Sequence, residues 1–150
     1  MILFLDIDGV LHPDPATADQ AFCQRALLWD FLIEAPQVSV VITSDWRLHH
    51  SLHELADFIL VGSNQGLLDR FVGVTPFLPA MKYEYQGREM ECLRWLADAG
   101  KQEEPWIAVD DVPSNFVFGR PNVLITDYRT GLTAEDVAKL AILVRTAASA

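Results

Sequence analysis

Cysteine, basic residues and long apolar runs are all scarce in this sequence. The 150 residues include two cysteines, Cys23 and Cys92, which stand far apart and form no CxxC or Cys/His pattern. A secreted disulfide scaffold and a cysteine-ligated zinc site are therefore not indicated. The pattern favours a reduced, cytoplasmic protein, with each cysteine inside a helix. No apolar stretch approaches the ~20 residues that a membrane-spanning helix needs, so no membrane partner is expected.

The shortage of basic residues restricts the partners of the chain. Eleven Lys and Arg stand against 21 Asp and Glu, which gives a formal net charge of −10. Because nucleic-acid phosphates repel such a chain, stable nucleic-acid binding is disfavoured. A phosphorylated substrate, either a small molecule or an exposed phosphate on a macromolecule, stays compatible with this charge, since a bound cation offsets part of the acidity of a site.

Apolar residues are abundant and arranged in short runs. They make up 51% of the sequence, enough for a core, and we expect residues 1–150 to form a single domain. β-Branched runs alternate with helical patterns, which predicts an α/β fold with a mostly parallel five-stranded sheet flanked by helices. The expected strands are 2–6, 38–42, 71–74, 106–109 and 123–125. The expected helices are 20–35, 45–59, 88–97 and a last helix capped by Thr133.

Polar residues follow three of the expected strands at the point where each strand ends. These residues are Asp6 and Asp8, Thr43 and Ser44, and Asp110 and Asp111. Parallel strands place their carboxyl ends at one edge of a sheet, where α/β proteins bind ligands. One aspartate in such a position is most often a turn residue. Four carboxylates at one edge are costly to bury without a cation, so the sequence predicts a Mg²⁺ site.

This set of residues suits phosphoryl transfer. An aspartate can attack phosphorus, and a second one two residues later can protonate the leaving oxygen. A hydroxyl at the start of a helix, here Thr43 or Ser44, can hold a phosphoryl oxygen. The transferring group also needs a protein cation, and the candidates are Lys82, Arg88 and Arg47.

The motifs in this order resemble the haloacid dehalogenase (HAD) superfamily. They are DxDG at 6–9, Thr43-Ser44, a basic residue at a helix start and Asp110-Asp111. Segments 4–11, 43–47, 88–96, 109–111 and 130–133 look more narrowly like the small HAD domains of Swiss Army Knife RNA repair proteins. The resemblance covers nearly the whole chain and implies a HAD-like Rossmannoid fold.

The resemblance also implies roles for individual residues. Asp6 would be the nucleophile and Asp8 the general acid and base. Mg²⁺ would be held by the Asp6 carboxylate, the Asp8 backbone carbonyl, and Asp110 or Asp111. Thr43 or Ser44 would bind the phosphate. The basic residue falls best on Arg88, with Lys82 as the alternative.

The function implied is that of a Mg²⁺-dependent phosphohydrolase that forms an aspartyl-phosphate. Two alternatives stay open, namely a catalytically weak phosphate- or partner-binding domain and a nucleic-acid-end phosphatase. In the last case Tyr83 and Tyr85 could stack on a base, although no basic stripe accompanies them. Relatives usually carry a cap domain after the first or second motif. Here residues 9–42 and 45–87 leave no room for a sizeable cap, so we expect an open site.

Three further features have two interpretations each. His49 and His53 have the spacing of a zinc-binding pair, but we interpret them as a solvated helix face. His12 either contacts substrate or lies in a polar loop, and loops are the more common place for such a residue. Trp46 is expected to pack in the interior. Arg47 can either bind phosphate or pair with an acid.

Overall fold

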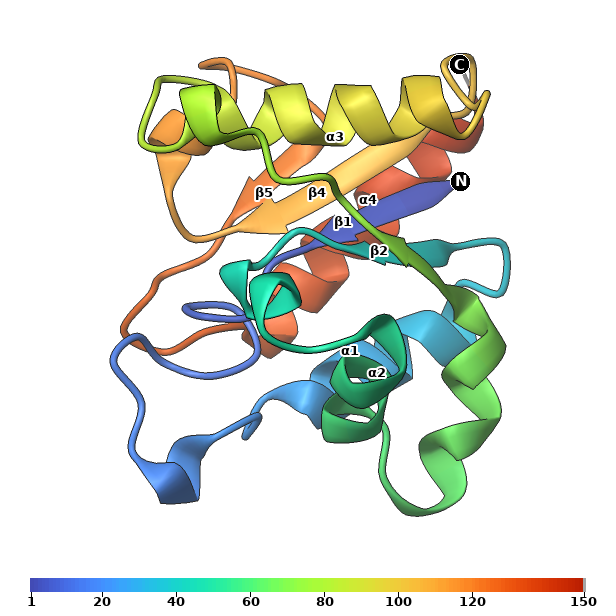
Figure 1. Cartoon of the computed structure of the whole chain (residues 1–150). Coiled ribbons are helices and arrows are strands. Elements are labelled where there is room, and N and C mark those ends of the chain that lie inside the picture. Colours follow the sequence, from blue (N-terminus) through green and yellow to red (C-terminus); the bar gives the residue numbers. More distant parts are fainter. Residues whose placement is uncertain (150) are drawn as a thin grey trace.

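The sheet of this protein contains five parallel strands in the order β3-β2-β1-β4-β5 (Figure 1). The structure is a computed structural model, and it describes residues 1–149. The predicted α/β fold with a five-stranded parallel sheet is confirmed. The strands are β1 Ile2–Leu5, β2 Ser39–Ile42, β3 Phe71–Val74, β4 Trp106–Asp110 and β5 Val123–Ile125.

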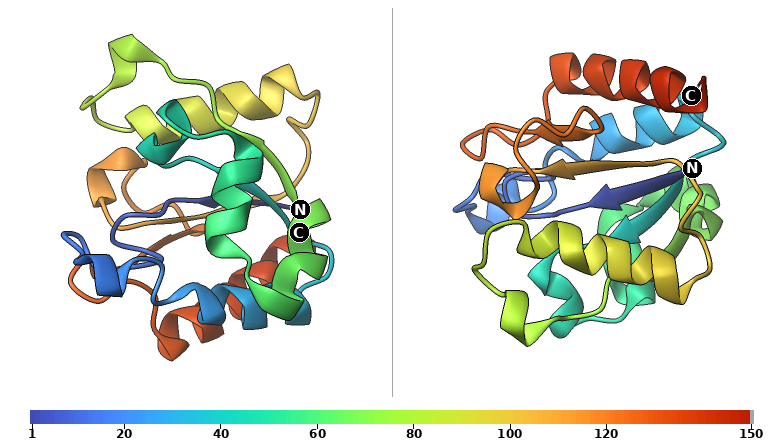
Figure 2. Two further views of the ribbon diagram at one scale, coloured as in Figure 1. Left: turned by 60° about the horizontal axis from the view of Figure 1, so that its bottom comes forward. Right: turned by 90° about the horizontal axis from the view of Figure 1, so that it is seen from above.

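Helices cover both faces of the sheet (Figure 2). Helices α1 (Arg25–Glu34) and α4 (Ala134–Ala148) lie side by side on one face, and α3 (Gly87–Asp98) lies on the opposite face. Helix α2 (Leu52–Ile59) connects β2 to the segment before β3. None of the described helices combines the length and apolar character needed to cross a membrane.

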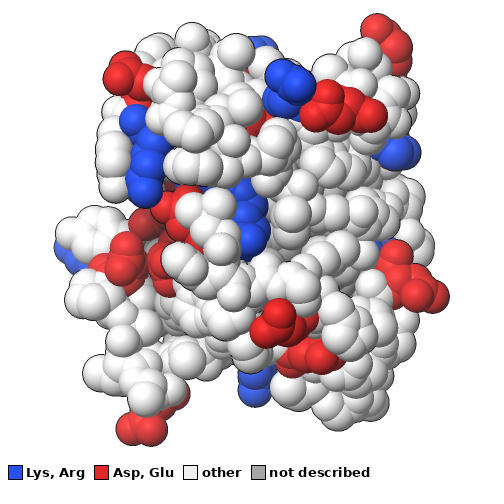
Figure 3. All heavy atoms as spheres, in the orientation of Figure 1, with Lys and Arg blue, Asp and Glu red and all other residues white. Residues whose placement is uncertain are grey.

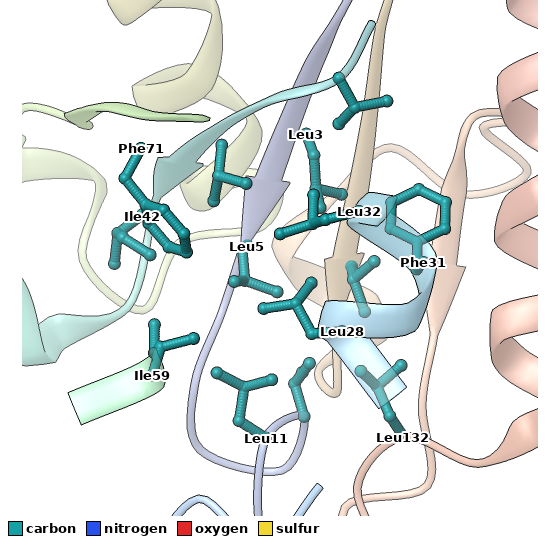
Figure 4. Close-up of a cluster of buried hydrophobic side chains, with 14 of the residues drawn as sticks. Leu3, Leu5, Leu11, Leu28, Phe31, Leu32, Ile42, Ile59, Phe71 and Leu132 are labelled. Carbon is teal, nitrogen blue, oxygen red and sulfur yellow. The ribbon is translucent and has the colours of Figure 1, made fainter. Parts of the chain in front are cut away.

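The core follows from the alternation of side chains along the strands. Leu3 and Leu5 of β1 point toward α1 and join a fully buried cluster with Leu28 and Leu32 (Figure 4). Phe4 points to the opposite face and packs beneath α3. Because both faces of β1 are covered by helices, its sequence is an unbroken apolar run rather than an alternating one.

Two predicted helices differ from the structure. The helix expected at 20–35 begins only at Arg25, because Phe22 has a left-handed backbone (φ 56°) that no α-helix contains. Cys23 consequently lies in a turn outside α1. The helix expected at 45–59 is two elements, a 3₁₀ turn over Asp45–Leu48 and then α2, because Ser51 starts a new helix with its own capping box. The other elements begin and end within one residue of their predicted bounds, and Thr133 caps α4 as predicted.

Strand order and register bring the polar strand ends together. The chain forms β1, β2 and β3 from the centre of the sheet toward one edge, and then crosses to the other side of β1 to form β4 and β5. The direction in which strands are added therefore reverses between β1 and β4. Such a reversal is where open α/β sheets bind ligands. Leu5 is paired with Ile42 and with Val109. The next residue of each strand, namely Asp6, Thr43 and Asp110, therefore lies at the same level of the edge.

Neighbouring positions on α1 provide a test of this packing. Leu32 is fully buried in the core, whereas Ile33 is 58% exposed. Leu32→Ala should lower the free energy of unfolding by about 2–5 kcal/mol, because it leaves a cavity. Ile33→Ala, the matched control, should change it by less than about 0.5 kcal/mol. Urea unfolding of both variants measures the difference, and equal losses would contradict the described face of α1.

Candidate functional site

Three carboxylates meet at the reversal point of the sheet. One oxygen each from Asp6, Asp110 and Asp111 lies within 4.8 Å of the others. Burial, with the charge of Asp110 adding to it, raises the pKa of Asp6 well above its usual value. Burial likewise raises the pKa of Asp110 to about 6 and raises that of Asp111. Figure 3 shows acidic side chains gathered in a hollow on this side of the molecule, with basic ones beside it.

The surrounding loops hold these carboxylates in place. Asp110 Oδ1 accepts hydrogen bonds from the Val112 backbone N–H (2.8 Å) and from Asn115 Nδ2 (3.1 Å). Gly9 has a left-handed backbone (φ 74°), and a Cβ there would lie 2.2 Å from Asp111 Oδ2. Only glycine therefore leaves room for the Asp111 carboxylate. Asn115 was not identified from the sequence, since an asparagine in a loop carries no signal of its own.

The donor set fits a hard divalent cation. Mg²⁺ prefers oxygen ligands and is bound by one or two carboxylates together with water and substrate oxygens. The three carboxylates supply such oxygens. Their burial disfavours the charged form, and a cation would reduce the repulsion between them. Asp8 does not belong to this cluster. Its predicted contribution through the backbone carbonyl stays a prediction.

Asp8 instead points toward His12 and Trp46. Its Oδ1 lies 2.7 Å from His12 Nε2 and 3.1 Å from Trp46 Nε1. The hydrogen bond to His12 is the main cause that lowers the pKa of Asp8. His12 lies in the expected loop, but it is only 3% exposed and contacts Asp8. Its position four residues after Asp8 was the only sequence signal of this contact.

The two hydroxyls after β2 have different surroundings. Ser44 Oγ caps the following 3₁₀ turn by accepting the Trp46 backbone N–H (3.3 Å). No hydrogen bond joins Thr43 Oγ1 to another residue of the described chain. The geometry therefore favours Thr43 over Ser44 as the phosphate ligand, and this assignment stays a prediction.

Arg88 lies beside the carboxylate cluster. Its Nη1 donates to the Thr43 backbone carbonyl and to Glu91 Oε2 (3.1 Å). Burial alone would lower the pKa of Arg88, but several carboxylates, Asp6 first and Asp110 second, outweigh it and raise the pKa. Of the two basic residues left open by the sequence, Arg88 is the one whose charge acts on the cluster, although its binding of phosphate stays a prediction.

Arg47 and Lys82 lie in different settings. The Arg47 side chain is buried, donates to the backbone carbonyls of Thr43 (2.6 Å) and Thr75 (2.8 Å), and pairs with Glu91 (2.8 Å). This contact is the acid pairing that the sequence offered as the alternative to phosphate binding. Lys82 Nζ lies 5.1 Å from the ring centre of Tyr83, beside the hollow rather than in the cluster.

The remaining predicted features lie outside the site. His53 is exposed and lies 3.4 Å from Asp57, and His49 is also exposed. The expected common helix face is wrong, because His49 lies in the turn before α2. Cys23 and Cys92 are both free, and Cys92 is buried within α3. Burial raises the pKa of the Cys92 thiol well above its usual value.

The sequence of the chain matches a known protein family. A family model described as the HAD domain in Swiss Army Knife RNA repair proteins matches residues 2–137. The chain belongs to this HAD family. The match spans all five strands and every residue of the site described above. No curated protein and no solved structure is significantly similar to the chain.

The structural role of Arg47 within this HAD domain can be tested. Arg47→Met should lower the free energy of unfolding by roughly 3–5 kcal/mol, because it breaks a buried ion pair and leaves backbone carbonyls without a donor. Arg94→Met removes an exposed pair with Asp98 and serves as the control, with a loss below about 1 kcal/mol. Urea unfolding measures both. A loss at Arg47 no larger than at Arg94 would refute the structural role.

Proposed function

We propose that this HAD domain is a Mg²⁺-dependent phosphohydrolase that acts on phosphoric monoesters. The observation that carries the proposal is the cluster of buried Asp6 and Asp110 with partly buried Asp111, with the Arg88 guanidinium beside it. Four charged groups converge at the edge of the sheet where ligands bind, and the family match supports a phosphohydrolase at a coarse level. Mg²⁺, held by the three carboxylates, would screen the anionic nucleophile from the anionic substrate.

In the first step Asp6 acts as the nucleophile. One of its carboxylate oxygens attacks phosphorus, and the bond from phosphorus to the ester oxygen breaks. Asp8 donates a proton to that leaving oxygen and becomes a carboxylate. Thr43 and Arg88 would hold the equatorial oxygens of the transferring group.

In the second step the aspartyl-phosphate is hydrolysed. Asp8, now ionised, takes a proton from a water molecule, whose oxygen attacks phosphorus. The bond between phosphorus and Asp6 breaks, so inorganic phosphate leaves with both aspartates restored.

The leaving group has an open place beside Arg88. A cavity of about 330 Å³ adjoins it, lined among others by Phe77, Lys82 and Tyr83. In the described chain, a 3₁₀ turn, α1 and β2 lie between Asp8 and Thr43, and α2, three 3₁₀ elements and β3 lie between Ser44 and Arg88, with no inserted sheet. Because no cap is inserted, we propose that the site admits a large phosphorylated substrate as well as a small one.

A phosphorylated RNA end is the second candidate substrate. The family is named for RNA repair proteins, and Tyr83, at the border of the cavity, is 94% exposed with Lys82 beside it. An exposed aromatic ring next to a cation can stack on a terminal base without stable binding of a long strand. Such brief contact is compatible with the acidic charge of the chain, which disfavours a lasting nucleic-acid partner. With two free cysteines, we propose a reducing, cytoplasmic location.

Hydrolysis of an aryl phosphate tests the reaction class. We expect activity with Mg²⁺, none with EDTA, and none in Asp6→Asn, because the amide cannot form the acyl phosphate. Asp127→Asn, an exposed aspartate paired with Arg129, is the matched control and should keep full activity. Active Asp6→Asn protein would remove the covalent mechanism. If wild type is inactive although Mg²⁺ raises its melting temperature, the domain binds phosphate or a partner without appreciable catalysis, or it needs a larger substrate.

A short RNA with a terminal phosphate tests the second candidate. Tyr83→Ala should lower kcat/KM for this substrate roughly tenfold or more, since stacking contributes about 1–3 kcal/mol per base. Its activity on acetyl phosphate, which has no ring, should not change. Ile142→Ala, an exposed truncation on α4, controls for loss of surface. Equal losses on both substrates would argue against stacking at Tyr83.

A further inference from the structure

The carboxylate of Asp8 is held by one of its two oxygens. Both side-chain donors that reach it, His12 Nε2 and Trp46 Nε1, contact Oδ1. Within the described chain, no hydrogen bond reaches Oδ2. An oxygen that already accepts two hydrogen bonds is a poor proton acceptor, whereas the second oxygen stays available. The two oxygens of Asp8 are therefore chemically different.

The backbone of Phe22 determines which nitrogen of His12 carries the proton. The Phe22 N–H donates to His12 Nδ1 (3.1 Å) in the buried interior. Nδ1 must therefore present its lone pair, and the single proton of a neutral imidazole lies on Nε2, directed at Asp8. Phe22 holds this N–H in place with a left-handed backbone (φ 56°), an uncommon conformation for an aromatic residue.

Aromatic rings enclose this contact. The His12 ring lies 5.3 Å from the Phe22 ring and 6.0 Å from the Trp46 ring, measured between centres. Trp46 packs in turn against Phe22 and Phe58, at 5.2 and 6.0 Å. The enclosure fixes the plane of the imidazole and of the indole. Neither donor can rotate away from Asp8 without displacing a packed ring.

We propose that His12, assisted by Trp46, is a positioning residue that makes Oδ2 of Asp8 the oxygen of proton transfer. The role rests on the proposed phosphohydrolase function. The proton on Oδ2 goes to the leaving oxygen as the ester bond breaks, and a proton from water returns to Oδ2 in the second step. His12 keeps its Nε2 proton throughout, so it orients the acid without taking part in the transfer.

Kinetics with two kinds of leaving group test the role. A nitrophenolate leaves with little help from an acid, whereas an alkoxide needs a proton. His12→Leu should lower kcat for glycerol phosphate by about 10- to 100-fold, a loss of the size expected for a misplaced catalytic group. It should change kcat for nitrophenyl phosphate less than threefold and KM for either substrate little. His12→Gln, which keeps a donor at the same reach, should restore most of the lost rate.

Control variants separate positioning from stability. His53→Leu removes an exposed histidine that pairs with Asp57 at the same four-residue spacing, and it should change neither rate. If His12→Leu does not fold, as urea unfolding would reveal, Trp46→Phe removes the other donor to Oδ1 and should lower the glycerol phosphate rate selectively. A selective loss restored by Gln supports the proposal. Equal losses on both substrates, or no loss, overturn it.

A measurement that needs no turnover tests the geometry itself. Long-range ¹⁵N–¹H NMR of the histidine rings should show His12 as a neutral imidazole protonated at Nε2. Asp8→Ala should shift both the His12 and the Trp46 ring N–H resonances, while His53 keeps its shifts. Protonation at Nδ1, or no response to Asp8→Ala, overturns the arrangement. If the resonances agree but wild type hydrolyses no phosphate ester, the phosphohydrolase function has failed, and the proton-transfer role is overturned with it.

Discussion

Repulsion among buried carboxylates is the constraint on which the rest of this site depends. Asp6, Asp110 and Asp111 occupy a space in which three negative charges are not stable by themselves, and burial raises the pKa of each. The central strands of the sheet hold Asp6 and Asp110 close together. β1 and β4 are neighbouring central strands, so the positions of Asp6 and Asp110 are set by backbone ladders rather than by flexible loops.

The two arginines at this edge of the sheet, Arg47 and Arg88, have different roles. Arg47 is saturated by backbone carbonyls and Glu91, which ties the end of β2 to the end of β3 and to α3. Arg88 also forms an ion pair with Glu91, and the charge of Asp6 raises the pKa of Arg88. Arg47 thus supports the framework against which Arg88 is positioned. The planar guanidinium suits both tasks, since it can bind several oxygens at once.

Much of the fold could be predicted because the relevant signals are local. The apolar run of β1 ends at Asp6, the β-branched run of β2 ends at Thr43, and the capping box at Thr133 starts α4. One of the two errors occurred where a tertiary contact overrides a local pattern. Residues around Phe22 have helical periodicity, but the Phe22 N–H is bound by His12, ten residues away. The helix after β2 was predicted as one piece because periodicity alone does not reveal that Ser51 caps a second helix.

The sequence by itself determined the succession of strands and helices along the chain, the residues at the strand ends and the chemistry that those residues can perform. The resemblance of its motifs to the HAD superfamily implied Asp6 as the nucleophile and Asp8 as its acid partner, and these roles stay predictions. Only the tertiary structure decided which polar groups contact one another. It assigned Arg47 to backbone carbonyls, left Arg88 beside the carboxylates and turned His12 toward Asp8. These outcomes depend on distances between segments far apart in the chain, and such distances are set by packing and strand register.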